Sequence, residues 1–255
     1  LAPLRETGDV LEARAARQRE DLFVKGLVPD AERECSEIRV EADGVWVARQ
    51  GAKGRGIEIK ALVAYEDKRE GRRVGVVHHA LVGAPKRFWE EGVARVAGRY
   101  SLLALKRCYA GTDGAKWCGA LGDYLHGPAV VHKLDPWHVN RAIKAACQDP
   151  RDAAPLLALL REGRIDELLG ELRARAAADP RAEPRMRTLG AYITANRKAI
   201  EADAPGMGTM EGTNAHLYAA RMKVWGGAWS AAGASDMARI RAALSSGETL
   251  PVPER

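Results

Sequence analysis

Apolar and polar residues alternate along the first half of the chain in a way that predicts one helix followed by several strands. An apolar stripe within an Ala-, Arg- and Glu-rich stretch predicts a helix from about Gly8 to Gly26. Period-two alternation then predicts strands at residues 38–49, 57–65 and 74–82, separated by short basic turns. Three strands joined in this way predict an antiparallel meander.

One more helix and two more strands complete the predicted sheet. Pro85 opens a helical pattern that extends to Tyr100, and strands are expected at residues 102–109 and 129–134. The order β-β-β-α-β-α-β predicts an α/β fold of the ribonuclease-H type. Its mixed five-stranded sheet is flanked by helices.

The second half of the chain has a helical composition. From Trp137 to about Ala204 no strand pattern occurs, and Ala, Leu and Arg dominate, which predicts an all-α insertion. Two further helices are expected at residues 211–224 and 234–244. We therefore expect an N-terminal helical segment, a main domain in two parts around a helical insertion, and a tail. In chain order these five segments are residues 1–36, 37–139, 140–205, 206–245 and 246–255.

Composition narrows the class of protein. The 255 residues are 46% hydrophobic and 29% charged, which suits a globular chain with a sizeable core. The net charge of +6 favours a polyanionic partner such as nucleic acid, although only weakly. Four scattered cysteines without a Cys-x-x-Cys pair indicate reduced thiols rather than a disulfide framework. No signal peptide or membrane-length apolar run is visible, so we expect a cytoplasmic protein.

Asp43 is the first candidate for chemistry, and it has two interpretations. Asp-Gly between alternating apolar runs is a strong hairpin signal, which would make Asp43 a turn residue. However, the run from Ile38 to Val47 contains no other turn residue, and a hairpin here would leave two very short arms. The alternative places Asp43 in the middle of a strand.

Asp113 and Glu211 also have ordinary structural explanations. Thr112-Asp113-Gly114 suits a turn or helix cap, and Glu211 suits the first turn of a helix. The functional interpretation places Asp113 at the carboxyl end of the fourth strand, beside the first, where open α/β sheets bind ligands. Three converging carboxylates would repel one another unless cations bound them. Magnesium prefers such oxygen ligands, and two ions suit the in-line cleavage of phosphodiesters.

Five short motifs in a fixed order carry a resemblance to a known family. They are Glu41–Val47, Thr112–Trp117, Lys133–His138, Met210–His216, and the run from Arg221 to Ser230. With these motifs the chain resembles bacterial insertion-sequence transposases that have an Asp-Asp-Glu site, of the broad Mutator-like type. It is most similar to the Lre-type group, and the resemblance covers roughly residues 38–244.

The resemblance implies both a site and an activity. Asp43, Asp113 and Glu211 would be the catalytic residues and the ligands of two Mg²⁺ (or Mn²⁺) ions. The enzyme would be a bacterial, nucleoid-associated transposase that cuts DNA at the ends of its element. It would then join the freed 3′-hydroxyl to target DNA, as a homo-oligomer in the active complex. The alternatives are a nuclease of the same fold without strand transfer, or an inactive, domesticated DNA-binding derivative.

The N-terminal region departs from the family. Relatives usually carry an extra amino-terminal DNA-binding region, whereas here only residues 1–36 precede the first strand and the chain begins with Leu1. We therefore keep a truncated or inactive copy as an alternative.

The resemblance and the local charge also suggest DNA contacts. The residues expected to touch DNA lie in or near the motifs, namely Lys116, Trp117, His138, Arg221, Lys223 and Trp229. For Trp225 and Trp229 the alternative is to anchor the helix end in the core, which we expect for one of the two. The cations of the two basic turns either contact phosphates or solvate hairpin tips. They are Lys53, Arg55, Lys68, Arg69, Arg72 and Arg73.

A zinc site is a weaker alternative. The spacing His132-x-x-Asp135-x-x-His138 suits metal ligands, but only Cys147 is near in sequence as a further ligand. We therefore expect His138 to lie at the start of a helix near the catalytic edge.

Overall fold

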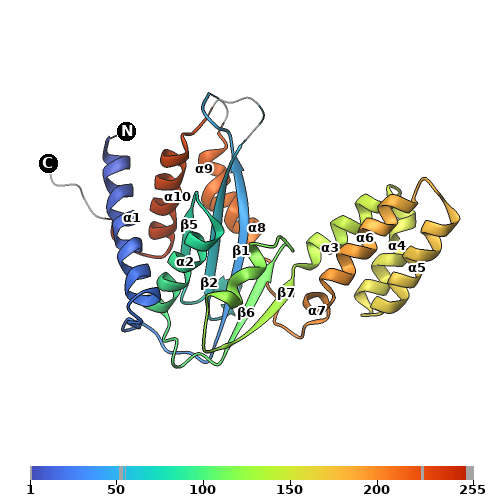
Figure 1. Ribbon diagram of the computed structural model, residues 1–255, viewed down its shortest axis with the longest axis horizontal. Coiled ribbons are helices and arrows are strands. Elements are labelled where there is room, and N and C mark those ends of the chain that lie inside the picture. The colour runs from blue at the N-terminus through green and yellow to red at the C-terminus, as the bar shows by residue number, and fades with distance from the viewer. Residues whose placement is uncertain (1, 52–53, 55, 225–226, 251–255) are drawn as a thin grey trace. The chain divides into compact units, whose positions relative to one another are not determined.

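The computed structural model describes residues 2–51, 54, 56–224 and 227–250 of the chain. Its centre is a mixed five-stranded sheet with the spatial order β5-β2-β1-β6-β7 (Figure 1). Numbered along the chain, the five strands therefore lie in the order 3-2-1-4-5, and the ribonuclease-H-like fold class is confirmed. The strands are β1 (Glu37–Val47), β2 (Ile57–Tyr65), β5 (Val77–Leu81), β6 (Arg107–Thr112) and β7 (Ala129–Leu134).

Asp43 lies in the middle of β1 and not in a turn. Strand β1 pairs antiparallel with β2 along its whole central part, and Asp43 stands opposite Ala61. The following Gly44 lies close to the side chain of Glu58 on β2, since a Cβ atom at this position would lie 2.7 Å from a carboxylate oxygen of Glu58. Because Asp43 and Gly44 are both paired within the continuous β1–β2 ladder, the hairpin alternative is wrong.

Two cores sandwich this sheet, because alternate residues of β1 face opposite sides. Ile38, Val40 and Ala42 pack with α2 (Pro85–Arg99), while Val45 and Val47 pack with the C-terminal helices. Those helices are α8 (Met210–Thr213), a π-helix (Asn214–Ala219), α9 (Ala220–Met222) and α10 (Ala231–Ser245). Helix α1 (Ala2–Phe23) packs against α2 and α10.

Several predicted boundaries are wrong. The fourth strand begins at Arg107 instead of residue 102, because the amides of Ala104 and Leu105 bond back to the carbonyl of Ser101 and form a turn. The expected third strand is shorter. Two short strands, β3 (Lys68–Arg69) and β4 (Arg72–Arg73), form a separate hairpin before it. The helix expected between the last two strands is only a 3₁₀ segment, Cys118–Asp123.

The chain divides into two compact units. The first comprises residues 1–110, 115–130 and 209–255, and the second comprises residues 111–114 and 131–208. The second unit contains the expected helical insertion and has its own core, which includes Ile143, Leu156, Leu168 and Ile193. Its helices are α3 (Pro136–Cys147), α4 (Pro150–Arg161), α5 (Ile165–Ala178), α6 (Glu183–Ala195) and α7 (Arg197–Glu201).

None of the helices in the described part of the chain combines the length and the apolar character needed to cross a lipid bilayer.

Candidate functional site

Glu41 fixes the start of the helix that carries Glu211. Its side chain is buried, and its carboxylate accepts hydrogen bonds from the Tyr65 hydroxyl at 2.6 Å and from the backbone amide and hydroxyl of Thr209, each at 2.7 Å. Thr209 directly precedes α8. A buried carboxylate that receives three donors is well satisfied, so this contact anchors the helix on the strand.

Asp43 makes the next contact between the same strand and the same helical segment. One carboxylate oxygen accepts the amide of Gly44 at 2.6 Å, and the other accepts Nδ2 of Asn214 at 2.7 Å. Glu41 and Asp43 share one face of β1 and lie about 6.8 Å apart along the strand. Their partners, Thr209 and Asn214, are separated by about 7.5 Å of helical rise. The two spacings match, so the helix runs alongside β1 and both contacts form together.

Glu211 lies in the first turn of α8, one turn before Asn214. Its side chain is exposed, while Met210, Tyr218 and Met222 of the same helical segment are buried in the core. Helix α8 and the π-helix after it both contact β1. The structure therefore places Asp43 and Glu211 on two packed elements of one compact unit.

Asn214 is a polar residue of this site that the sequence did not identify as functional. It is only 8% exposed, and its Oδ1 atom has no hydrogen-bond partner within the described part of the chain. It also begins a π-helix, a form that occurs mostly in short stretches, frequently at functional sites. The available signal was its position three residues after Glu211, which places both side chains on one side of a helix.

Asp113 belongs to the second unit, where it directly follows β6. The next residue, Gly114, has a φ of 93°, which turns the chain sharply after the strand. The carboxylates of Asp113 and Asp135 lie near the Tyr192 hydroxyl. Burial is the main cause that raises the pKa of Tyr192, and these two negative charges raise it further. Asp113 and Asp135 therefore form an acidic region within the second unit.

The residues predicted to contact DNA have different surroundings. Trp117 packs edge-on against Phe88 at 5.3 Å between ring centroids, which gives it a structural role in the core. Trp229 donates its indole N–H to the carbonyl of Met222 and packs on the core, so the expectation that one tryptophan anchors the helix end is confirmed for it. His138 is half-buried in α3. Three of the predicted DNA contacts have exposed side chains, namely Lys116, Arg221 and Lys223.

Three other residues considered at the sequence level, Lys53, Arg55 and Trp225, lie outside the described residues.

The zinc alternative finds no support. Asp135 caps the start of α3 by accepting the amide of Trp137 at 2.9 Å. Within the described ranges, His132, Asp135 and His138 do not belong to any group of three ligands close enough to share an ion. The expectation that His138 lies at the start of a helix is confirmed.

Comparison with known protein families shows which family the chain belongs to. A family model described as an uncharacterised protein family, UPF0236, matches residues 6–252. The chain belongs to this family. No curated protein matches the chain significantly. The UPF0236 match includes Asp43, Asp113 and Glu211 together with the helical insertion, so the whole candidate site lies within the family's extent.

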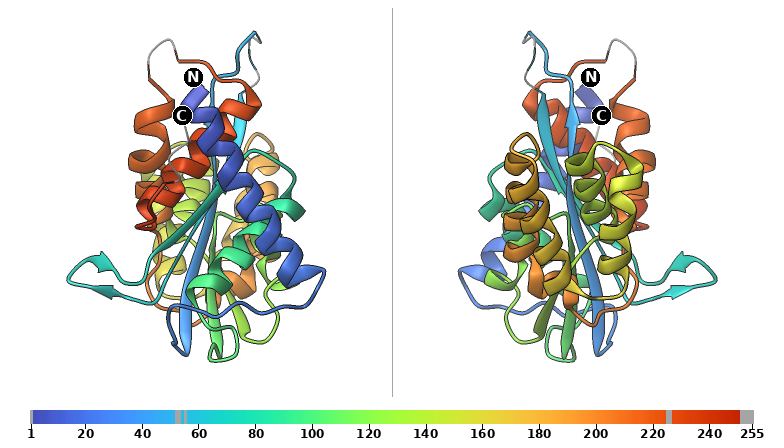
Figure 2. Two further views of the ribbon diagram at one scale, coloured as in Figure 1. Left: turned by 90° about the vertical axis from the view of Figure 1, so that its left-hand side faces the viewer. Right: turned by 90° about the vertical axis from the view of Figure 1, so that its right-hand side faces the viewer.

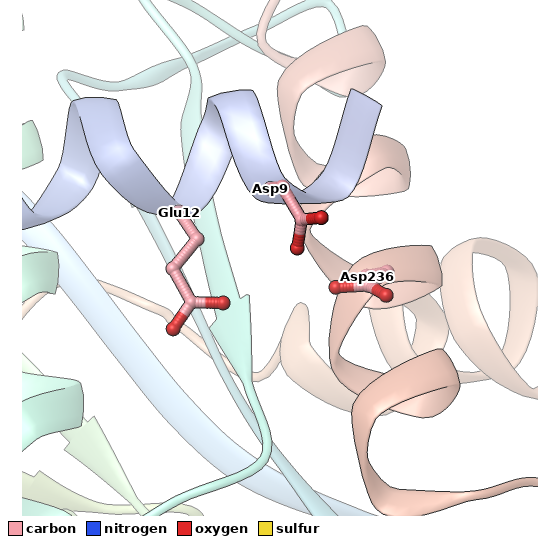
Figure 3. A group of neighbouring side chains, drawn as sticks. All are labelled: Asp9, Glu12 and Asp236. Atoms are coloured by element: carbon pink, nitrogen blue, oxygen red, sulfur yellow. The ribbon is translucent and has the colours of Figure 1, made fainter. Parts of the chain in front are cut away.

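This UPF0236 chain also has a carboxylate cluster that the sequence did not suggest. Asp9 and Glu12 of α1 and Asp236 of α10 place carboxylate oxygens within 4.8 Å of one another (Figure 3). Such oxygens could hold a metal ion. However, Arg5 lies 3.3 Å from Asp9 and 3.4 Å from Asp236, and Arg87 binds Glu12. The arginines already offset much of the negative charge.

Asp236 should make stability depend on pH. Burial is the main cause that raises the pKa of its carboxyl group, and the nearby charges of Asp9 and Glu12 raise it further. The folded state therefore binds the proton more tightly than the unfolded state, whose aspartate pKa is about 3.9. The contribution of Asp236 to stability is largest below that value and falls as the pH rises through the folded pKa.

Urea unfolding of the wild type and of Asp236→Asn across this range tests the prediction. We expect the stability of the wild type relative to the variant to fall as the pH rises. A difference that stays constant or grows with pH would contradict it.

Proposed function

We propose that the chain is a DNA transposase that uses two metal ions to cleave the ends of an element and transfer them to target DNA. The observation that carries this proposal is the contact between Asp43, in the middle of β1, and Asn214, one turn after Glu211. Two of the three carboxylates expected in an Asp-Asp-Glu site thus belong to elements that pack together. Asp113 follows β6, the neighbour of β1 in the sheet.

The donor atoms suit magnesium. Carboxylate oxygens are hard ligands, and Asp43, Asp113 and Glu211 supply them. Gly44 and Asn214 each donate to one oxygen of Asp43, so the carboxylate is held in a fixed orientation on the strand. The Oδ1 atom of Asn214, buried and without a partner in the described part of the chain, adds one more oxygen beside Asp43.

Each residue has a defined task in this proposal. Asp43, Asp113 and Glu211 would hold the ions, and Asn214 fixes the orientation of Asp43 through its amide. When bound, two such ions activate the attacking hydroxyl and stabilise the leaving oxygen of an in-line displacement. Glu41 holds Thr209 and so sets the position of Glu211 along β1.

The implied partner is DNA, as element ends and as target, with a homo-oligomer in the active complex. The net charge of +6 is compatible with a polyanion, and the motifs in their order support a transposase. A nuclease of the same fold would share the metal ligands, so only the product distinguishes the two activities.

A cleavage and joining assay tests the proposal and the metal requirement together. The substrate is a labelled duplex taken from the DNA that borders the coding sequence, mixed with a plasmid target. With Mg²⁺ or Mn²⁺ we expect nicked ends and covalently joined products, and excess EDTA should remove both, because the phosphodiester chemistry depends on the ions.

The outcomes separate the candidate functions. Metal-dependent nicks without joined products would favour the nuclease. The same activity with EDTA as with Mg²⁺ would rule out the two-metal mechanism. Specific DNA binding without any cleavage would favour the inactive, domesticated derivative.

A further inference from the structure

A basic pocket lies beside α8. It has a volume of about 540 Å³ and belongs entirely to the first compact unit. None of the described residues that line it is acidic. The lining includes three cations, two histidines and three hydroxyl side chains. They are Lys68, Arg73, Arg241, His78, His216, Thr209, Thr213 and Ser245.

His78 provides an unsatisfied donor or acceptor in the wall of this basic pocket. The residue is only 3% exposed, and its Nδ1 atom has no hydrogen-bond partner in the described part of the chain. Burial, and then the charges of Arg73 and Arg95, lower the pKa of His78 to about 3. The imidazole is therefore neutral at neutral pH, and Nδ1 donates or accepts one hydrogen bond according to which ring nitrogen carries the proton. A buried polar atom without a partner destabilises the fold, and pairing it would offset that cost.

The β3–β4 hairpin extends the positive charge away from the pocket. It projects from the sheet as the turquoise hairpin in Figure 2. Its strands pair Lys68 with Arg73 and Arg69 with Arg72, so like charges stand directly opposite one another. Like charges that stand opposite one another repel, and a bound polyanion would reduce this repulsion. Glu70, in the turn, is the one acidic residue among positions 68–73.

We propose that the basic pocket and the β3–β4 hairpin together bind the phosphodiester backbone of a nucleic acid. This proposal extends the proposed function. It depends on that function only for the statement that the nucleic acid is DNA. Guanidinium, ammonium and hydroxyl groups are the side-chain donors that commonly contact phosphates. A row of cations that continues along a projecting hairpin fits a polymer with repeated phosphates better than a single small anion.

The basic pocket lies next to Glu211, one of the proposed metal ligands. Arg73 donates to the hydroxyl of Thr213 at 2.9 Å and lies 3.4 Å from that of Thr209, so the hairpin is attached to the helix of Glu211. Gly212, which lines the pocket, directly follows Glu211. A backbone phosphate held there would place the strand next to a proposed metal ligand.

Gly212 offers a matched pair of variants. A Cβ atom at this position would have no atom within 4 Å, so a larger side chain can be accommodated. Gly212→Glu places a negative charge in the pocket, and Gly212→Gln places a neutral group of the same size there. Binding of a labelled DNA duplex to the full chain is measured by fluorescence anisotropy in EDTA, so that no cleavage is needed. We expect Gly212→Glu to bind at least about tenfold more weakly than Gly212→Gln, since each lost phosphate contact weakens binding and lowers its salt dependence.

A second pair of variants tests the hairpin without disturbing the fold, because Arg69 and Arg72 are exposed. The slope of log K against log salt concentration changes by about 0.9 for each phosphate contact. The double variant Arg69→Ala/Arg72→Ala, which removes two such contacts, should therefore reduce the steepness of this slope by about 1.8. The control removes the same charge elsewhere on the first unit, as Arg17→Ala/Lys86→Ala, and should leave the slope almost unchanged.

Several outcomes would overturn the proposal. They are equal DNA affinity of Gly212→Glu and Gly212→Gln, equal effects of the two double variants, or tighter binding of polyglutamate or a mononucleotide than of DNA. The binding assay is independent of the proposed chemistry. Charge-dependent binding without any cleavage would support this site while contradicting the transposase, and cleavage with unchanged binding would do the reverse.

Discussion

Asp43→Asn should lower the rate of metal-dependent DNA cleavage by about a thousandfold or more. The substitution keeps the shape of the side chain and an oxygen that can accept the hydrogen bond from Asn214. It removes the negative charge that a metal ion requires. Metal ions supply several kcal/mol of transition-state stabilisation, and each 1.36 kcal/mol changes the rate tenfold. The single-turnover rate on a labelled DNA substrate measures the effect.

Asp30→Asn provides the control for this prediction. Asp30 is exposed and lies outside the helices and strands of the first unit. The cleavage rate of the Asp30→Asn variant should therefore remain close to that of the wild type. Far-UV circular dichroism of both variants checks that the fold is intact. If a folded Asp43→Asn protein retained more than about a tenth of the rate, Asp43 would not be a metal ligand in the cleavage step.

Glu91→Ala should lower the free energy of unfolding by about 3–5 kcal/mol, because it leaves the buried charge of Arg239 without its partner. The Glu91 side chain is completely buried in α2 and binds Arg87 at 2.6 Å and Arg239 at 2.8 Å. Arg239 is itself only 5% exposed. Nearby His79, whose pKa is lowered by burial so that it stays neutral, has no negative charge with which to balance Arg239. Urea unfolding at neutral pH measures the change.

The neighbouring Glu90 makes a matched control. It contacts Lys86 at 3.8 Å and Arg19 at 4.0 Å, and both of these partners are partly exposed. Glu90→Ala should therefore cost less than about 1 kcal/mol. The double variant Glu91→Ala/Arg239→Met should recover part of the lost stability, because it removes the unpaired guanidinium. If Glu90→Ala and Glu91→Ala lowered the free energy of unfolding equally, the buried Glu91–Arg239 pair would contribute no more to stability than an exposed one.

The sequence predicted those parts of the fold whose signal is local. Apolar alternation located the strands at residues 57–65 and 129–134 as the structure has them. It did not locate the start of β6, because Leu102 and Leu103 look like strand residues in isolation. Their segment is a turn whose amides bond to Ser101, and Leu103 is 88% exposed.

The details of the candidate site depend on contacts between distant parts of the chain. Glu41 looked like an ordinary polar residue of a strand, and its role follows from a bond to Thr209, 168 positions away. Asn214 is similar, since its partner Asp43 is 171 positions away. Asp43 itself could be assigned to a strand or a turn, and the pairing with β2 decided between them. No local pattern contains this information.

The wide helical turn at Asn214–Ala219 has a geometric consequence for the chain around it. In a regular α-helix, Met210 and Met222 would point about 120° apart around the axis. One extra residue absorbed in a π turn reduces this angle to about 20°, so both methionines reach the same core. The irregularity thus lets a single helix bury its two ends in one hydrophobic layer while its middle presents an amide to a carboxylate on the sheet.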